Sequence, residues 1–333
     1  MAVGSGIGGY VGAGIESTYG TYAAPTQFLR AISAPLKEDR TRVHRVGLTG
    51  GAFLPDSDGY LDTTRQVSGD VDVYLMDVGM GALIQTLMGT TVTPVQQAAT
   101  TAYLQTHTMA DPAGKSVTLQ SVIPQLDGTA RVFSFLGCKV ASADFSFPLA
   151  AEATAKFTVD GQQLDETQTA ATASFPTGRQ YVGTDVNVKV GAIGSEASVD
   201  GVRKVDVTIG RPMRTDRFYL GAAGVKKEPI LNARDLSVTG TIDSDFIDKT
   251  IWQDRFTGNT GFSLVVEAVG SLIASTYYHT FRITLPNCHL TGATPELNGP
   301  DVVTGSFPFV CLRDSATGDL PKIEIISTET TVA

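Results

Sequence analysis

Cysteine is scarce in this sequence of 333 residues, which contains only Cys138, Cys288 and Cys311 and no CxxC pair. A disulfide framework needs more cysteines and usually an even number, so we interpret these three as small buried hydrophobes in a reducing compartment. The N-terminus has no basic stretch before an apolar core, which argues against an export signal. The longest apolar run, Phe262–Ser275, is too short to span a bilayer and contains Glu267. We therefore expect a protein that folds in a cytoplasm and has no membrane partner.

Sequence patterns that bind cofactors or metals, or that form catalytic sites, are missing as well. Only four histidines are present, without an HExxH pattern, and there is neither a GxSxG elbow nor a Walker loop. The GxGxxG pattern at Gly4–Gly9 follows no strand, and Asp56–Gly59 matches the start of a calcium loop but lacks its distal Glu. We therefore predict no catalytic activity, no cofactor and no bound metal.

Positive charge is in deficit, because 25 Lys and Arg residues face 34 Asp and Glu residues, for a net charge of −9. Stable binding to nucleic acid depends on basic side chains that neutralise phosphates, so this balance argues against it. An acidic surface repels DNA instead, and this suits a protein past which DNA must move without being bound.

Alternation of apolar and polar residues is the strongest local signal in the chain, and it is typical of half-buried strands. Every second residue is apolar in Ala141–Phe147, in Ala153–Val159 and in Lys204–Ile209. Clusters of Gly, Asp, Asn and Pro between such runs predict turns. The sequence therefore predicts a mainly β fold.

Two parts of the chain resemble each other. Val67–Asp77 aligns without gaps on Val238–Asp248, 171 residues later, with four identical and four conservative positions. Two further blocks lie at offsets of 150 and 190 residues. The pairs at 150 are Cys138 with Cys288, Phe157 with Phe307 and Val159 with Phe309, and those at 190 are Phe28 with Phe218 and Lys37-Glu38 with Lys227-Glu228. Three blocks in the same order predict a duplication.

The duplication predicts two domains, residues 1–170 and 171–333, joined by the linker Thr167–Arg179. In each copy an acidic strand precedes a short helix, and Asp77 and Asp248 are the predicted helix N-caps. The first helix carries a single apolar stripe formed by Met80, Leu83, Ile84, Leu87 and Met88. We expect two antiparallel β-sandwich or barrel domains, each with one flanking α-helix.

The change of offset from 190 to 171 predicts about 19 extra residues in the first copy, within a long loop over residues 39–65. This segment is rich in glycine, and loops of this length are usually functional or disordered. Its candidate functional residues are Gly47, Gly50, Gly51, Pro55 and Asp58.

Four acids occupy matching positions in the two copies: Asp70, Asp72, Asp243 and Asp245. Alternation places them on the strand face opposite the core. A catalytic pair of carboxylates would not need to be built twice, so two interpretations remain open. The acids either form an ordinary solvated face or line a channel.

Several motifs together resemble the major tail proteins, or tail tube proteins, of siphophages, and most of all those of phages that infect actinobacteria. The resemblance extends over nearly the whole chain, from the N-terminus to about Leu312. The motifs are Gly4-Ser-Gly-Ile-Gly-Gly, Glu16-Ser-Thr-Tyr-Gly-Thr-Tyr, Gly79-Met-Gly-Ala-Leu, Tyr103-Leu-Gln-Thr-His-Thr, Asp216-Arg-Phe-Tyr-Leu-Gly and Leu285-Pro-Asn-Cys-His-Leu.

The resemblance implies tail-tube-like domains whose inner strands join between subunits around a lumen, in rings that stack through an extended loop. It implies a tape-measure protein inside the tube, tail terminator and distal tail proteins at its ends, and DNA only in passage. The chain would be assembled in the host bacterial cytoplasm and become part of the virion tail. On this basis we predict that the four acids face the lumen and that residues 39–65 are an inter-ring arm, disordered in a free subunit.

Rings of this kind have six domains around the channel, so a duplicated chain predicts a trimer with pseudo-six-fold symmetry in preference to a hexamer. Two other functions stay open from the sequence alone. One is a β-sandwich adhesin or receptor-binding virion protein, and the other is the tube of a contractile phage-like particle.

Overall fold

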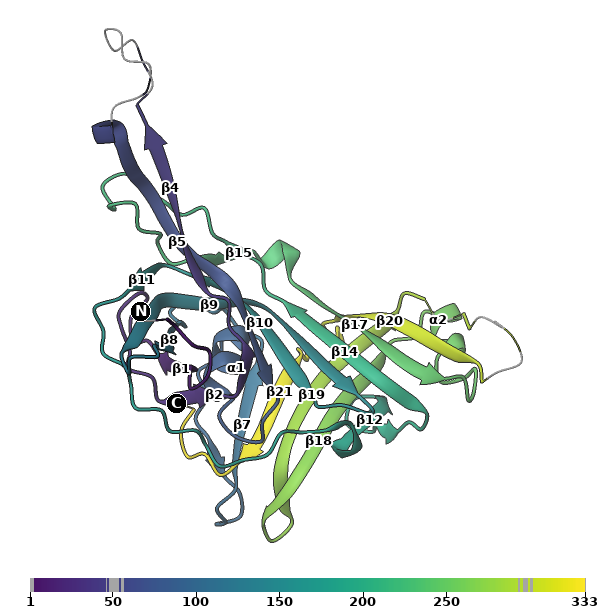
Figure 1. The fold of residues 1–333 in the computed structure, drawn as a ribbon. Coiled ribbons are helices and arrows are strands. Elements are labelled where there is room, and N and C mark those ends of the chain that lie inside the picture. The colour runs from purple at the N-terminus through teal and green to yellow at the C-terminus, as the bar shows by residue number, and fades with distance from the viewer. Residues whose placement is uncertain are drawn as a thin grey trace.

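The computed structural model describes residues 3–45, 47, 54, 57–292, 294–295, 299 and 302–332, with the backbone alone at Asp58 and Ala233. The chain is mainly β, and all strand pairs between the named strands are antiparallel, as predicted. Figure 1 shows two sandwiches side by side, with one long hairpin projecting from the first. Two α-helices complete the described fold.

The first half of the chain contains eleven strands, one α-helix and one 3-10 turn. In chain order these are β1 (Tyr10–Ile15), β2 (Gln27–Leu29), β3 (Ala31–Ser33), β4 (Lys37–His44), η1 (Ser57–Gly59), β5 (Tyr60–Tyr74), α1 (Gly81–Met88), β6 (Val95–Gln96), β7 (Tyr103–Thr108), β8 (Val117–Pro124), β9 (Ala130–Pro148), β10 (Thr154–Gly161) and β11 (Gln163–Asp165).

The second half contains ten strands, one α-helix and two 3-10 turns. These are η2 (Gly183–Asp185), β12 (Val186–Gly191), β13 (Ala197–Ser198), β14 (Val202–Gly210), β15 (Met213–Arg214), β16 (Ile230–Leu231), η3 (Ala233–Asp235), β17 (Ser237–Asp245), α2 (Gln253–Thr257), β18 (Phe262–Ala274), β19 (Tyr277–Leu290), β20 (Thr304–Leu312) and β21 (Lys322–Ser327).

The long strand β9 belongs to both sheets of the first sandwich. Its first part pairs with β8 and β11, and its second part pairs with β10, which in turn pairs with β5. Gly137 lies where the strand passes from one sheet to the other, with φ of 65°. A side chain there would be strained, and its Cβ would lie 2.8 Å from Gln162 and 3.0 Å from Tyr19. Glycine is therefore required at this bend.

Between the two sheets lies an apolar core that the alternation correctly predicted. Phe145 and Phe157 are almost completely buried there and meet edge to face, with ring centroids 6.0 Å apart. Helix α1 packs against β9 and β7, and all of its residues are buried. The predicted stripe underestimated this burial, because strand β7 covers the face of the helix that faces away from the first half.

Strand β7 is the clearest exchange between the halves. It comes from the first half but pairs with β21, so it extends the outer sheet of the second sandwich, β13–β12–β18–β19–β21–β7–β6. In the other direction, the C-terminal segment returns to the first half. The carbonyl of Val332 accepts a hydrogen bond from Gln27 (2.6 Å), and Glu329 accepts one from the backbone N–H of Gly79 (2.9 Å). The two halves are therefore interlocked.

The inner sheets of the two halves are joined into one. β14, the first strand of the second inner sheet, pairs with the second part of β9 over seven residue pairs, from Lys204 with Pro148 to Gly210 with Ser142. The result is a continuous inner sheet in the order β4–β5–β10–β9–β14–β17–β20. We call the β9–β14 ladder the seam.

The strand registers repeat with two of the offsets seen in the sequence. Val71 pairs with Phe157, and Ile242 pairs with Phe307, which are the same positions shifted by 171 and 150 residues. Likewise Val159 pairs with Val140, and Phe309 pairs with Leu290, both shifted by 150. The inner sheets are therefore equivalent residue by residue.

The third sequence block, at an offset of 190, is wrong. Lys37 pairs with Ser68, and Thr208 pairs with Thr239, so Lys37 corresponds to Thr208 at the same offset of 171. Lys227 and Phe218 lie outside all strands. The first copy therefore has no extra residues at this point. The same length of chain forms the β4–β5 hairpin in one half and an irregular excursion in the other.

The excursion, residues 211–236, folds back over the first half. The ammonium group of Lys226 is completely buried and lies 2.5 Å from Oδ1 of Asp160. Lys139 is equally buried and lies 2.5 Å from Oε1 of Glu228. Because an unpaired buried charge is strongly destabilising, these two pairs hold the excursion in place.

His107 gives the fold a testable dependence on pH. It is fully buried on β7, and burial lowers its pKa to about 4. The unfolded chain binds the same proton near pH 6.5, so it takes up more protons between these values. We expect the free energy of unfolding to fall by about 3 kcal/mol as the pH drops from about 6.5 to 4. Urea unfolding across this pH range measures the change.

His107→Gln should flatten this pH dependence, whereas His289→Gln, at a partly exposed histidine, should leave it intact. An equal slope in the His107→Gln variant and the unmodified chain would show that other groups cause the effect.

Candidate functional site

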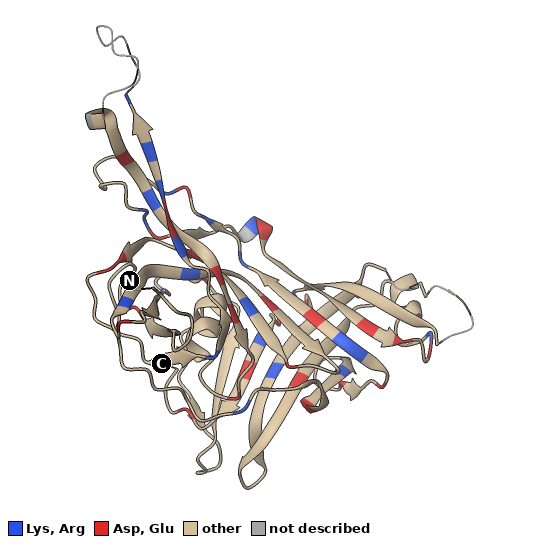
Figure 2. Ribbon diagram, viewed as in Figure 1, with Lys and Arg blue, Asp and Glu red and all other residues tan. Residues whose placement is uncertain are grey.

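The polar face of the inner sheet gathers the acids predicted from the sequence. Val71 and Val73 point into the core, so Asp70 and Asp72 lie on the opposite face, and the same alternation around Ile242 places Asp243 there. Asp245 ends β17 on this face. Figure 2 shows acidic and basic residues following one another across these strands.

Each of the four acids has a basic or hydroxyl neighbour. Asp70 accepts hydrogen bonds from Lys156 (3.0 Å) and Thr158 (2.9 Å). Partial burial alone would raise the pKa of Asp70, but these two donors outweigh it and lower the pKa below its usual value. Asp72 accepts a hydrogen bond from Ser33 (2.6 Å).

In the second half, Asp243 lies opposite Lys204 in the β14–β17 register, and Asp245 lies 2.7 Å from Nε of Arg203. The face is therefore acidic but locally compensated.

Two further acids of this face cross the seam, and the sequence analysis did not select them. Ser146 donates a hydrogen bond to Asp206 (2.6 Å), and Thr208 donates one to Asp144 (2.7 Å). The pairs run in opposite directions between β9 and β14, so each strand supplies one carboxylate and one hydroxyl. Alternation could have found both acids, but nothing local indicated that the two strands would be neighbours.

Acids outnumber bases on this face, and no described helix covers it. The acids are Asp39, Asp70, Asp72, Asp144, Asp206, Asp243 and Asp245, and the bases are Lys37, Lys156, Arg203 and Lys204. Ser and Thr hydroxyl groups occupy most of the intervening positions. Such a surface is hydrated and weakly acidic, so a polyanion is repelled without a strong local trap.

The two inner-sheet edges are the second feature of the site. β3 and β4 pair with β5 on one side, and none of the described residues pairs with their other side. On the far side of the molecule, β20 pairs with β19 only over Phe309–Leu312, so Thr304–Pro308 has no ladder partner opposite β17 in the described chain. In the first half, β9 fills the equivalent position beside β10.

The predicted structureless loop over residues 39–65 is wrong, because most of the segment belongs to a regular hairpin. β4 and β5 are paired from Lys37 with Ser68 to His44 with Tyr60. Arg40 lies 2.5 Å from Glu38, and Arg42 lies 2.6 Å from Asp62, across the exposed ladder.

Of the candidate arm residues, Gly47 is exposed beyond the end of β4, and Asp58 lies in the 3-10 turn before β5. Gly50, Gly51 and Pro55 lie outside the described residues.

The predicted helix N-caps are also wrong. Helix α1 begins after Met80 and α2 after Trp252, and neither has a side-chain cap. Asp77 accepts a hydrogen bond from the backbone N–H of Arg179 (3.0 Å), and Asp248 accepts one from that of Thr250 (3.0 Å). The carboxylates therefore stabilise the linker and a local turn, which compete with the helix end for the same side chain.

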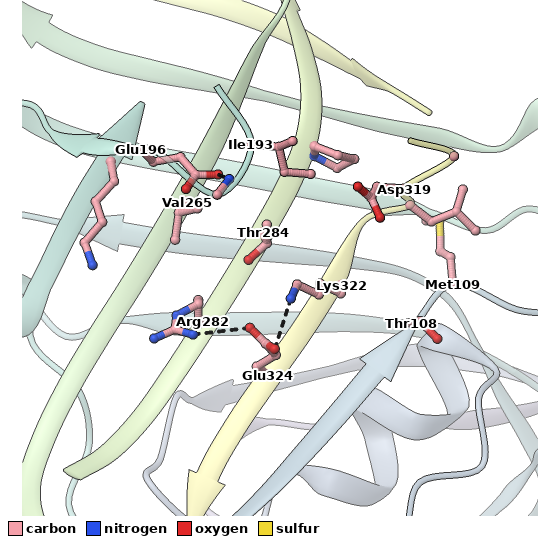
Figure 3. Close-up of a pocket in the computed structure, with 15 residues that line it drawn as sticks. Thr108, Met109, Ile193, Glu196, Val265, Arg282, Thr284, Asp319, Lys322 and Glu324 are labelled. Carbon is pink, nitrogen blue, oxygen red and sulfur yellow. Dashed lines mark hydrogen bonds and ion pairs between the residues drawn. The ribbon is translucent and has the colours of Figure 1, made fainter. Parts of the chain in front are cut away.

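A hollow of about 650 Å³ lies on the outer face of the second sandwich, beside Arg282 and Lys322 (Figure 3). Its floor is a cross-strand ladder in which Arg282 lies between Glu267 and Glu324, and Lys322 lies 3.1 Å from Glu324. Burial would raise the pKa of Glu267, but hydrogen bonds from Lys189 and Arg282 lower it overall. Because these charges neutralise one another, we assign the ladder to sheet stability.

Other kinds of site are not indicated in the described part of the chain. No group of three His, Cys, Asp or Glu residues is arranged there to hold a metal ion. The helices that the structure describes are too short or too polar to cross a membrane.

A comparison with known families gives one match. A family model described as phage tail tube protein matches residues 6–311. The matched segment starts before β1 and ends at Cys311, within β20, so it includes both inner sheets, the seam and the projecting hairpin. A search of the curated proteins found no match.

Proposed function

We propose, from the premise that the chain belongs to the phage tail tube protein family, that three copies close a ring and that stacked rings form the tube of a long, non-contractile tail. Membership of the family makes the chain a structural component of the virion tail. The finer proposals concern how copies join, what the channel holds and how the rings stack.

The seam is the observation that carries the ring proposal. Within one chain, the last strand of one inner sheet pairs with the first strand of an equivalent inner sheet. The chain repeats this arrangement at its ends, because the β3–β4 edge corresponds to β14 and the β20 end corresponds to the β10–β9 end. A second copy can therefore continue the sheet in the same direction, as in a head-to-tail interface that closes into a ring.

Three chains contribute six equivalent inner sheets to such a ring. Closure removes both free edges, which would otherwise promote aggregation. The alternative is a ring of six chains in which one sandwich forms the channel and the other lies outside it. The joined sheet favours three, because the seam places the polar faces of both halves on the same side of one surface.

The channel is then lined by the acidic face with its hydroxyl groups. A tape-measure protein would occupy it before infection, and DNA would pass through it without stable binding. Tail terminator and distal tail proteins would cover the two ends of the tube. Assembly in the host cytoplasm agrees with the three buried, unpaired cysteines.

The first test blocks one edge of the sheet. Pro308 directs its carbonyl toward the side away from β17, since it accepts from Thr291, so strand alternation places the N–H of Ser306 on that same open side. Ser306→Pro removes this donor and leaves the β17 ladder intact. We expect a folded chain that forms neither rings nor tubes in negative-stain electron microscopy.

Ser306→Ala is the matched control, because it keeps the backbone donor, and it should assemble like the unmodified chain. If Ser306→Pro formed tubes as readily as Ser306→Ala, the β20 edge would not join copies.

The second test concerns the channel wall. Replacing Asp70, Asp72, Asp243 and Asp245 by Lys should leave tubes intact but slow DNA release from virions, most strongly at low salt, because a basic wall attracts phosphate. The rate of DNA release at two salt concentrations measures this. The control places four lysines at exposed acids away from this face, Asp127, Glu166, Asp248 and Asp319. Equal slowing in both variants would mean that the four acids do not face the channel.

The third test concerns stacking. The projecting hairpin exposes Val43, Tyr60 and Leu61, each about half exposed or more. Apolar side chains gathered on a projecting ladder suit a surface that a neighbouring ring covers. Replacing all three by Thr should preserve the hairpin and the rings but prevent tube elongation, as seen by electron microscopy. Replacing the nearby Thr41 and Thr63 by Ser is the control. Long tubes from the triple variant would place the stacking contact elsewhere.

A further inference from the structure

Arg211 makes the most buried contact between the halves. It follows directly after β14, and its side chain is 2% exposed. Its guanidinium donates hydrogen bonds to the carbonyl of Met88 (2.7 Å) and to that of Ala110. Met88 is the last residue of α1, so a cation from the second half caps the carboxyl end of a helix in the first half. Helix carboxyl ends carry partial negative charge and unsatisfied carbonyls, so this is a favourable site for a cation.

Arg40 is the residue equivalent to Arg211. Asp39 pairs with Gln66, and Gly210 pairs with Ser237, so the next residues, Arg40 and Arg211, occupy the same position at an offset of 171. Their surroundings differ. The side chain of Arg40 is 41% exposed and forms surface ion pairs with Glu38 and Asp62. Exposed pairs of this kind contribute little to stability, so Arg40 can exchange them for a better partner.

The helix equivalent to α1 has a free carboxyl end. α2 packs against β19, as α1 packs against β9. Its end is exposed, and the carbonyls of Thr257 and Gly258 accept no hydrogen bond from the described residues. The nearby cation Arg255 lies over the ring of Phe262, 5.1 Å from its centroid, and Lys249 is paired with Asp254.

We propose that Arg40 of one copy binds the carboxyl end of α2 on a second copy, as Arg211 binds that of α1 within the chain. This inference rests on the proposed ring, in which the first half of one copy follows the second half of another. The contact adds a side-chain lock to the strand pairing. It also gives the subunit junction a donor that no other residue of the hairpin supplies, because Met213 occupies the position equivalent to Arg42.

The test compares Arg40→Met with Arg42→Met, measuring the concentration at which rings form by mass photometry. Both arginines are exposed on the same strand and pair with Asp62, so both variants should melt like the unmodified chain. We expect Arg40→Met to raise the concentration for ring formation about tenfold or more, since hydrogen bonds to charged groups are among the stronger ones. Arg42→Met should stay within about twofold of the unmodified chain, and Arg40→Lys should restore part of the loss.

The outcomes separate this inference from the ring proposal. If the unmodified chain forms no rings at any concentration, the proposed function fails and this contact fails with it. If the unmodified chain forms rings and Arg40→Met forms them as readily as Arg42→Met, only the Arg40 contact is overturned. A map of the assembled ring that places the Arg40 guanidinium away from the end of α2 would overturn it as well.

Discussion

The pairing of β9 with β14 is the interaction on which the rest of the structure depends. It joins two sandwiches built from equivalent strands, and it does so in a direction that leaves the same two edges at the ends of the chain. A sheet with two complementary free edges is unstable as an isolated object, because each edge presents unpaired backbone groups. Closure with further copies satisfies those groups without any new type of contact. The fold of one chain therefore contains the template for its own assembly.

The remaining features of the molecule support that ladder. Strand β7 and the C-terminal segment cross between the halves, so neither sandwich is complete without the other. The excursion over the first half buries Lys226 and Arg211, and their partners fix the angle between the sandwiches. Buried charges are costly when unpaired, so these contacts specify one arrangement more than they add stability. A tube wall that guides DNA needs such a fixed angle, since the lumen diameter depends on it.

The sequence alone was sufficient for the strands, the repeat and the acidic face, because these depend on local alternation and on residue identity. The offsets of 171 and 150 reappear as strand registers at Val71 and Phe157. The offset of 190 misled, because Lys37-Glu38 and Lys227-Glu228 are alike in composition but differ in structure. It hid the equivalence of Arg40 and Arg211, which only the registers show. The seam and the crossing of β7 could not be predicted, since pairing between distant strands leaves no local signal.

The number of chains in each ring of an assembled tube tests this account most directly. Cryo-electron microscopy of tubes formed by the unmodified chain measures it through the rotational symmetry and the strand connections in the map. The account predicts three chains per ring, with alternating seams within and between chains and six similar inner sheets around the channel. Six chains per ring, with one sandwich of each outside the channel wall, would contradict it.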